Sequence, residues 1–310
     1  MIYKIVKNVY IVLCTGILLL CIFGIYCEYK EKEVAAAFER AGFRPVLSLD
    51  NNEFVGFYVY DWWSGRISVN IYTGESGNNK PLRQINNDTF NFLEKIKITE
   101  IVVSGEQTNR LQLERILQLN VKYMSIFFDY IEGESTMCIP LRYFKRFEIC
   151  YISGLNEQEI ILLTENFHAE EMTIRRKDSS GKFDNTISLS AETFTNIVTS
   201  NRSKNITLCN ISITDSDEIT QCVRKVDCNH RYNRVILGDC HSLSQILEII
   251  EHVNIDELIL YFSESREKDF EKILRVLRLH EFKNAQYVTL ILDKTSIDIK
   301  GSLAESMGVF

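Results

Sequence analysis

The sequence predicts an α/β protein: a right-handed strand–helix solenoid that follows an N-terminal transmembrane helix and a β-hairpin cap. The main observation is a short apolar strand phrase that occurs eight times, in steps of 23 to 34 residues. Self-similarity at such a period is typical of a solenoid, in which each unit buries its apolar side against the next. The second observation is an N-terminal run of 20 residues without a charge. The strand phrases are centred on Ile101, Met124, Phe147, Met172, Ile206, Val235, Leu258 and Val288.

The uncharged run, residues 8–27, predicts a transmembrane signal anchor. As a helix, 20 residues span a hydrocarbon core of about 30 Å. The run is longer than the apolar part of a typical signal peptide, about 7–15 residues, although a cleaved signal peptide remains the alternative. Lys4 and Lys7 precede the run. By the positive-inside rule they predict a cytoplasmic N-terminus and an extracytoplasmic body, whether periplasmic, lumenal or extracellular.

Residues 28–43 predict a charged helical stalk that leaves the membrane as a solvated helix. Without Lys4 and Lys7, the 35 basic residues of the chain fall to 33, against 42 acidic ones, so the rest of the chain has a net charge of −9. This balance argues against a nucleic-acid partner, which requires a basic surface. It also argues against tight contact with an anionic bilayer.

Residues 44–84 predict an N-terminal cap with a β-hairpin. Two strand-like stretches, 54–63 and 66–74, flank Ser64-Gly65, which suits a two-residue turn. A solenoid needs an atypical unit to cover its first open face. The aromatic residues of the first stretch are therefore interpreted as cap residues, and a ligand-contact patch is the alternative.

Residues 85–310 form the predicted solenoid, because a helical pattern precedes the first strand phrase and follows most of the others. Several of these patterns open on Ser or Asp, which accept hydrogen bonds from the free amides of a first helical turn. Helices are expected at 89–97, 109–120, 156–167, 190–201, 215–226, 242–253 and 268–282.

The repeat resembles the leucine-rich repeat family, in the variant with a helix on the convex side. The family frame L-x-x-L-x-L-x-x-N/C-x-L fits Tyr232, Val235, Leu237 and Cys240, with Cys240 in the Asn/Cys place. The resemblance covers about residues 85–295 and implies a horseshoe with a concave parallel sheet. Ile, Val, Phe and Met largely replace Leu, and the Asn place varies too much for an Asn ladder. The rival is a doubly wound sheet or a barrel, which also alternates strand and helix.

The sequence predicts no cofactor and no metal site. The histidines lie in no known catalytic frame. The spacing of Cys222, Cys228, His230, Cys240 and His241 matches no standard zinc site. Cys222 and Cys228 are the candidate disulfide pair, whereas Cys150, Cys209 and Cys240 fall in strand phrases and are interpreted as core residues.

The function expected from this architecture is binding: a membrane-anchored module that contacts a protein partner, of unknown identity, through the concave face. The alternative is an α/β enzyme with a carboxylate site at the carboxyl ends of the strands, formed by Glu106, Asp129, Asp239 and Asp293. In a solenoid these four would instead lie in the turns after the strands. The residues expected to point outward from the concave face are Ser125, Phe127, Glu148, Thr173, Arg175, Thr207, Ile236, Tyr261 and Thr289.

Overall fold

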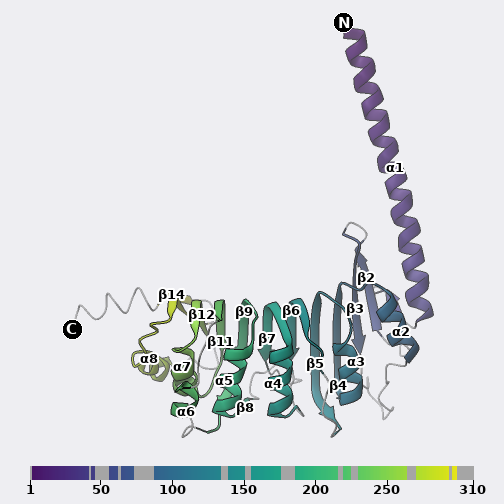
Figure 1. Cartoon of the computed structure of the whole chain (residues 1–310). Coiled ribbons are helices and arrows are strands. Elements are labelled where there is room, and N and C mark those ends of the chain that lie inside the picture. Colours follow the sequence, from purple (N-terminus) through teal and green to yellow (C-terminus); the bar gives the residue numbers. More distant parts are fainter. Residues whose placement is uncertain are drawn as a thin grey trace.

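The computed structural model is built around one open, mostly parallel sheet of 12 strands, whose order across the sheet follows the chain (Figure 1). The described residues are 2–41, 43–45, 56–61, 64–72, 87–133, 139–150, 155–175, 186–215, 219–224, 230–263, 270–292 and 295–298. The sheet is not closed, because β1 and β14 lie at its two edges.

The strands of the main sheet are β1 (Phe43–Pro45), β2 (Gly56–Asp61), β3 (Arg66–Tyr72), β4 (Glu100–Asn109), β5 (Tyr123–Glu132), β6 (Arg142–Cys150), β7 (Phe167–Arg175), β9 (Asn205–Cys209), β11 (Arg231–Gly238), β12 (Asn254–Phe262), β13 (Ala285–Leu292) and β14 (Thr295–Asp298). A second sheet pairs β8 (Ile187–Leu189) with β10 (Ile211–Ile213). The helices are α1 (Ile2–Arg40), α2 (Asn87–Lys95), α3 (Arg110–Leu117), α4 (Glu157–Asn166), α5 (Ala191–Ser200), α6 (Ile219–Arg224), α7 (Leu243–Ile250) and α8 (Phe270–Leu277). All eight predicted strand phrases and all seven helices predicted for the repeats are present, whereas β1, β8, β10 and β14 were not predicted.

The eight predicted strand centres lie side by side in one row across the sheet. Each pairs with the next, from Ile101 with Met124 to Leu258 with Val288. All eight side chains are buried, with at most 1% of their surface exposed. The hydrophobic pattern therefore sets the register, since a shift by one residue would turn this whole row toward solvent.

A bulge near the start of the strands explains why residues three apart are both buried. The amides of Lys122 and Tyr123 both donate to the carbonyl of Thr99, and those of Lys145 and Arg146 both donate to that of Lys122. In a regular strand, residues three apart face opposite sides. Here Phe144 and Phe147 are both buried, and their ring centroids lie 5.2 Å apart.

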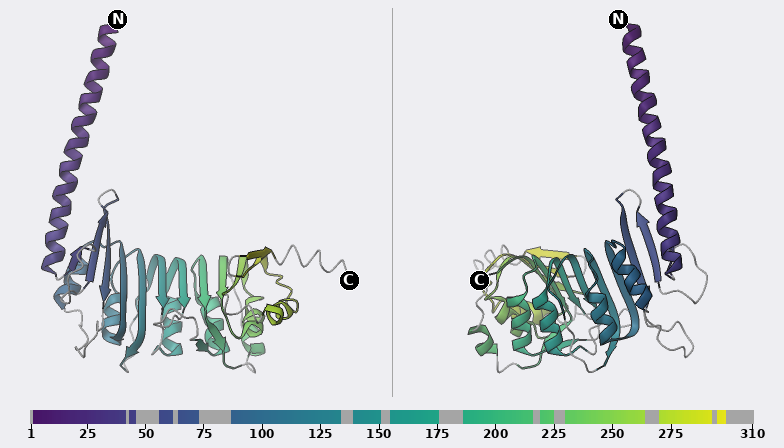
Figure 2. Two further views of the ribbon diagram at one scale, coloured as in Figure 1. Left: turned by 180° about the vertical axis from the view of Figure 1, so that it is seen from behind. Right: turned by 45° about the vertical axis from the view of Figure 1, so that its right-hand side comes forward.

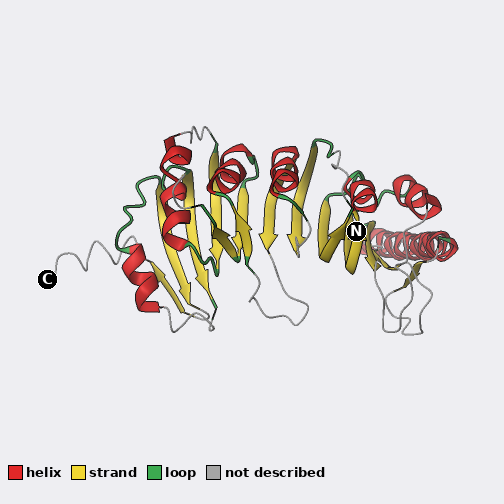
Figure 3. Ribbon diagram, turned by 90° about the horizontal axis from the view of Figure 1, so that it is seen from below, coloured by secondary structure: helices red, strands yellow, loops and turns green. Residues whose placement is uncertain are grey.

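Helices cover one face of the sheet, and α3 to α7 follow one another along it (Figure 3). The helices begin at the carboxyl ends of the strands, where polar residues cap them. Asn156 and Glu159 form a complete capping box at α4, and the side chain of Ser190 accepts a hydrogen bond from the amide of Thr193 at α5. The predicted cap of α7 is only partly right, because the side chain of Ser242 makes no such bond.

Two strands end at residues in the left-handed backbone conformation. Asn210 (φ 57°) follows β9, and Asp239 (φ 48°) follows β11. Asn and Asp tolerate this conformation better than other side chains do. The amide of Asn210 donates to the carbonyl of Gly238, and the chain then turns into β10, which pairs with β8.

The predicted membrane segment is the first part of one continuous helix, α1. It is long and apolar enough to cross a membrane, and only 6% of its most apolar window is buried, so it is not a core helix of the body. By length and composition alone, a signal sequence would also fit. In Figures 1 and 2 the helix extends far from the sheet.

The last turn of α1, at the end of the predicted stalk, is docked on the sheet, whereas residues 28–37 are exposed or partly exposed. Phe38 is fully buried, and its ring stacks on that of Tyr58 at 4.5 Å. It also contacts the rings of Phe43 and Phe92 edge-on. The predicted anchor is thus joined to the body through an aromatic cluster.

The predicted hairpin is present as β2 and β3, which are antiparallel. Its connection is longer than the predicted two residues, because Asp61 pairs with Arg66 and positions 62–65 lie between them. Gly65 has a positive φ of 63°. Trp62 and Trp63 lie outside the described residues. β3 pairs in parallel with β4, and Val69 lies beside Ile101. The hairpin therefore extends the main sheet by strand pairing.

Candidate functional site

The face of the sheet opposite the helices, which we call the open face, carries the nine residues predicted to point outward. Six of them share one row across the strands and three share the next row. The first row holds Ser125, Glu148, Thr173, Thr207, Ile236 and Thr289, and the second holds Phe127, Arg175 and Tyr261. Most of them are partly exposed, whereas the rows on the helix face are buried. The structure brings the nine side chains onto one surface; their role in binding stays a prediction.

A polar cluster lies near the middle of this surface, around Arg175. Its Nη2 lies 2.6 Å from Oε1 of Glu148, and its Nε donates to Sγ of Cys150 at 3.0 Å. Oγ of Ser125 donates to the other oxygen of Glu148 at 3.4 Å. These contacts join β5, β6 and β7, so the guanidinium is held in a defined position with 34% of its side chain exposed.

The two thiols of the second row are not reactive nucleophiles. Burial, with the neighbouring Glu148 carboxylate, raises the pKa of Cys150 to about 12. Burial likewise raises the pKa of Cys209 to about 11. The thiolate is the nucleophile, so both groups stay protonated and inert near neutral pH. Arg175 separates them in the row by two strand spacings, about 9.6 Å, which exceeds the limit of about 7 Å for a disulfide.

The prediction that both cysteines are core residues is therefore only partly right. Cys150 is buried, but it and Cys209 lie on the open face. Cys240 is 1% exposed, and its thiol points to the carbonyls of Leu208 and Gly238. Cys222 is buried and Cys228 lies outside the described residues, so that pairing stays a prediction.

A third row on the open face was missed. Arg146 extends over the ring of Tyr123 and reaches Glu100, two strands away, at 3.3 Å. Arg234 pairs with Glu257 on the next strand at 2.6 Å. The alternation around each strand centre already indicated this row, because the residue before the centre points the same way as the residue after it.

The four carboxylates of the alternative enzyme site are not shown to form a site. β4 continues to Asn109 and β5 to Glu132, so Glu106 and Asp129 lie inside strands and not in turns, which corrects the prediction. The side chain of Asp239 is buried and accepts the amide of Ser263 at 2.8 Å, which fixes the turn after β11. Asp293 lies outside the described residues. Within the described residues, no group of three His, Cys, Asp or Glu side chains is placed to hold a metal.

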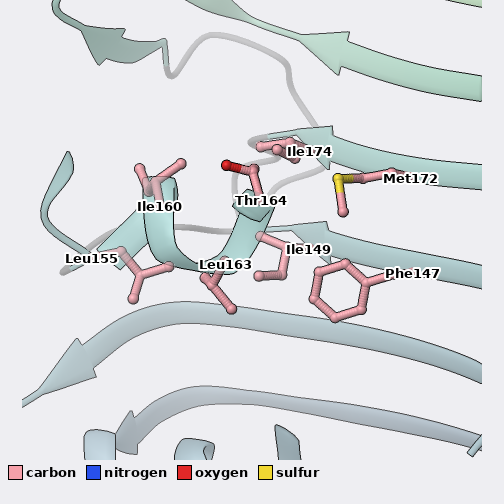
Figure 4. Close-up of a pocket in the computed structure, with 8 residues that line it drawn as sticks. All are labelled: Phe147, Ile149, Leu155, Ile160, Leu163, Thr164, Met172 and Ile174. Atoms are coloured by element: carbon pink, nitrogen blue, oxygen red, sulfur yellow. The ribbon is translucent and has the colours of Figure 1, made fainter. Parts of the chain in front are cut away.

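The helix face holds a small cavity beneath α4 (Figure 4). It has room for about one water molecule, and its lining is almost entirely apolar, so a substrate or cofactor would not fit. The lining residues are Phe147, Ile149, Leu155, Ile160, Leu163, Thr164, Met172 and Ile174. The open face is therefore the candidate site.

Comparisons of the chain with protein-family models, with curated proteins and with solved structures found no match, so the geometry of the open face alone carries the functional argument.

Proposed function

We propose that this protein is a membrane-anchored binding module that contacts a protein partner through the open face. The observation that supports this proposal most strongly is a broad, partly exposed sheet surface that combines aromatic and arginine side chains with small polar ones. Tyr123, Phe127 and Tyr261 lie there with Arg146 and Arg175. Aromatic residues and Arg are enriched at protein interfaces and supply most of their binding energy.

The finer architecture that we infer is a leucine-rich-repeat-like solenoid with a concave open face. Two features support it. The bulge allows the first and second apolar positions of the L-x-x-L frame to be buried together, as at Phe144 and Phe147. The thiol of Cys240, in the Asn/Cys place, points to backbone carbonyls of the neighbouring turn.

The anchor is α1, and we infer that the body lies outside the cytoplasm. The exposure of Val12, Leu20 and neighbouring apolar side chains suits a lipid environment. Lys4 and Lys7 precede the apolar run, and the positive-inside rule places them in the cytoplasm.

Photocrosslinking in cells tests the binding surface. A photoreactive amino acid replaces Thr207 or Thr289 on the open face, or, as matched controls, Ser244 or Glu248 on the exposed side of α7. We expect a discrete crosslinked protein from the open-face positions and none from α7. Crosslinks from α7 only, or equal yields from both surfaces, would contradict the proposal.

A further inference from the structure

The edge of the sheet at which the parallel strands begin faces the same way as the apolar end of α1. β2 runs toward the turn at Ser64-Gly65 and β3 runs back from it, so β3 and the strands parallel to it begin at this edge. Figures 1 and 2 show the hairpin turn and the N-terminus of α1 on the same side of the sheet. If α1 spans a bilayer, this edge of the body faces the bilayer surface.

The edge also lies close to that surface. Phe38 stacks on Tyr58. Tyr58 pairs with Val69, and Val69 pairs with the strand centre Ile101, so Phe38 lies at about the level of the strand centres. Phe38 lies eleven positions after Cys27, the end of the uncharged run, which is about 16 Å along the helix. The bulge at Thr99 is two residues nearer the membrane, about 7 Å. The edge is thus about 10 Å from the bilayer boundary, comparable to a Debye length of about 8–10 Å.

Basic side chains gather along this edge, although the body as a whole is acidic. We call Lys97, Lys122, Lys145, Arg202 and Lys204 the basic edge. All five are exposed. Lys97, Lys122, Arg202 and Lys204 lie in the connections that lead into β4, β5 and β9, and Lys145 lies near the start of β6. Within the described residues, Lys97, Lys122 and Lys145 form no ion pair, whereas Lys204 lies 3.5 Å from Glu170.

Two acidic side chains lie at the opposite edge. Glu157 and Glu192 lie in the first turns of α4 and α5, where the helix dipole favours an acid. Net charge carries no position, so the balance of −9 does not by itself exclude contact between this edge and an anionic bilayer. The exposed Glu170 also lies at this edge, between Lys145 and Lys204.

Two exposed apolar side chains lie beside the basic edge. Leu141 is 58% exposed and Tyr143 is 75% exposed, next to Lys145 at the start of β6. A tyrosine beside basic residues is typical of a membrane–water interface, where the ring lies at the level of the headgroups.

We infer that the basic edge lies on the bilayer that α1 spans and binds anionic phospholipid headgroups, so that the sheet stands with its strand starts against the membrane. This inference rests on the membrane anchoring in the proposed function and is independent of the partner on the open face. A helix tilt of about 20° is common and would bring the more distant strands to the surface.

The test uses the full chain in nanodiscs of phosphatidylcholine, with or without phosphatidylglycerol. A photoreactive amino acid replaces Tyr143 at the basic edge, and the matched control carries it at Leu111, which is 67% exposed at the opposite edge. We expect lipid adducts by mass spectrometry from position 143 only, several-fold more in the anionic discs. Equal adducts from both positions, or no adduct from position 143, would overturn the inference.

Charge reversal separates headgroup binding from mere proximity. Lys122→Glu with Lys145→Glu and Lys204→Glu should reduce the adducts at position 143 in anionic discs by about tenfold or more, since each basic side chain near the surface contributes to the attraction. Lys272→Glu with Arg275→Glu, exposed on α8, should not. Unchanged adducts in the triple variant would show that position 143 lies near the bilayer although the basic side chains bind no headgroups, and would contradict the inference. Failure of the chain to enter nanodiscs would instead refute the anchor of the proposed function.

Discussion

Arg110 and Glu159 form a buried ion pair that joins the start of α3 to the start of α4. Nε of Arg110 lies 2.6 Å from Oε1 of Glu159, and their side chains are only 10% and 3% exposed. Glu159 also accepts the amide of Asn156 in the capping box of α4. The Glu159 carboxylate thus caps the N-terminus of α4 and links two repeats.

Removing one partner of this pair should be costly. Arg110→Met leaves a buried carboxylate without its counter-charge, and we expect a loss of about 3 kcal/mol in the free energy of unfolding. Adding Glu159→Gln removes the charge and should recover part of the loss. Chemical unfolding of the detergent-solubilised chain, followed by circular dichroism, measures both. An unchanged stability in Arg110→Met would show that the pair contributes nothing.

His168, near the start of β7, is a buried histidine whose protonation the fold opposes. Burial lowers its pKa below 6.5, and the nearby Arg202 and His230 lower it further. The unfolded chain then binds a proton at a higher pH than the folded one. Stability should therefore fall as pH drops below about 6.5, and the loss should level off below the lowered folded pKa.

Comparing the unfolding free energy at pH 7.5 and at pH values down to 5 tests this dependence. His168→Phe keeps an aromatic ring beside Tyr143 and should flatten that part of the profile. His252→Gln, at an exposed position, should leave it unchanged. If both variants retain the slope of the natural chain, another group is responsible.

At the scale of the elements, each strand has two faces with different roles, and β12 shows this most clearly. Leu258 is fully buried between Val235 and Val288, whereas Ile259 lies on the open face and is partly exposed. Two consecutive residues therefore offer a matched comparison of the core and the candidate binding surface.

Leu258→Asp should unfold the C-terminal repeats. It removes about 1.5–3 kcal/mol of burial and adds the cost of an unpaired buried carboxylate, against a typical domain stability of about 5–15 kcal/mol. Hydrogen exchange should rise mainly over residues 232–293 and much less over 98–152, since stacked repeats contact chiefly their neighbours. Ile259→Asp should leave protection near normal. Uniform loss over all strands in Leu258→Asp would indicate one cooperative sheet instead of a repeat array.

At the scale of the whole molecule, a continuous helix connects the predicted anchor to an aromatic cluster at one end of the sheet. Because Phe38 is fully buried against Tyr58, the body is not free to swing on a flexible tether. This connection relates the direction of the strands to that of α1, and the inferred contact of the basic edge with the bilayer rests on it.

The orientation across the membrane can be tested with fusions to Phe310. The positive-inside rule applied to Lys4 and Lys7 predicts a cytoplasmic N-terminus, so a reporter that works only outside the cytoplasm should be active. A reporter that works only in the cytoplasm should be silent at the same position. The reverse pattern would refute the extracytoplasmic location of the body.

Local signals in the sequence determined the elements of this protein. The strand centres, the repeat helices and the hairpin at Ser64-Gly65 follow from apolar periodicity, caps and turn residues, each of which acts over a few positions. The same alternation indicated which side chains share the open face, because the period of a strand is two.

The tertiary structure alone decided what depends on register and direction. Arg175 contacts Glu148 and Cys150, which lie 27 and 25 residues before it in the sequence, and no local pattern predicts such partners. The extension of β4 and β5 past Glu106 and Asp129, the docking of Phe38 and the basic edge were likewise absent from the sequence argument. Net charge carries no position, so only the folded arrangement shows that Lys122, Lys145 and Lys204 lie along one edge of the sheet, on the side to which α1 extends.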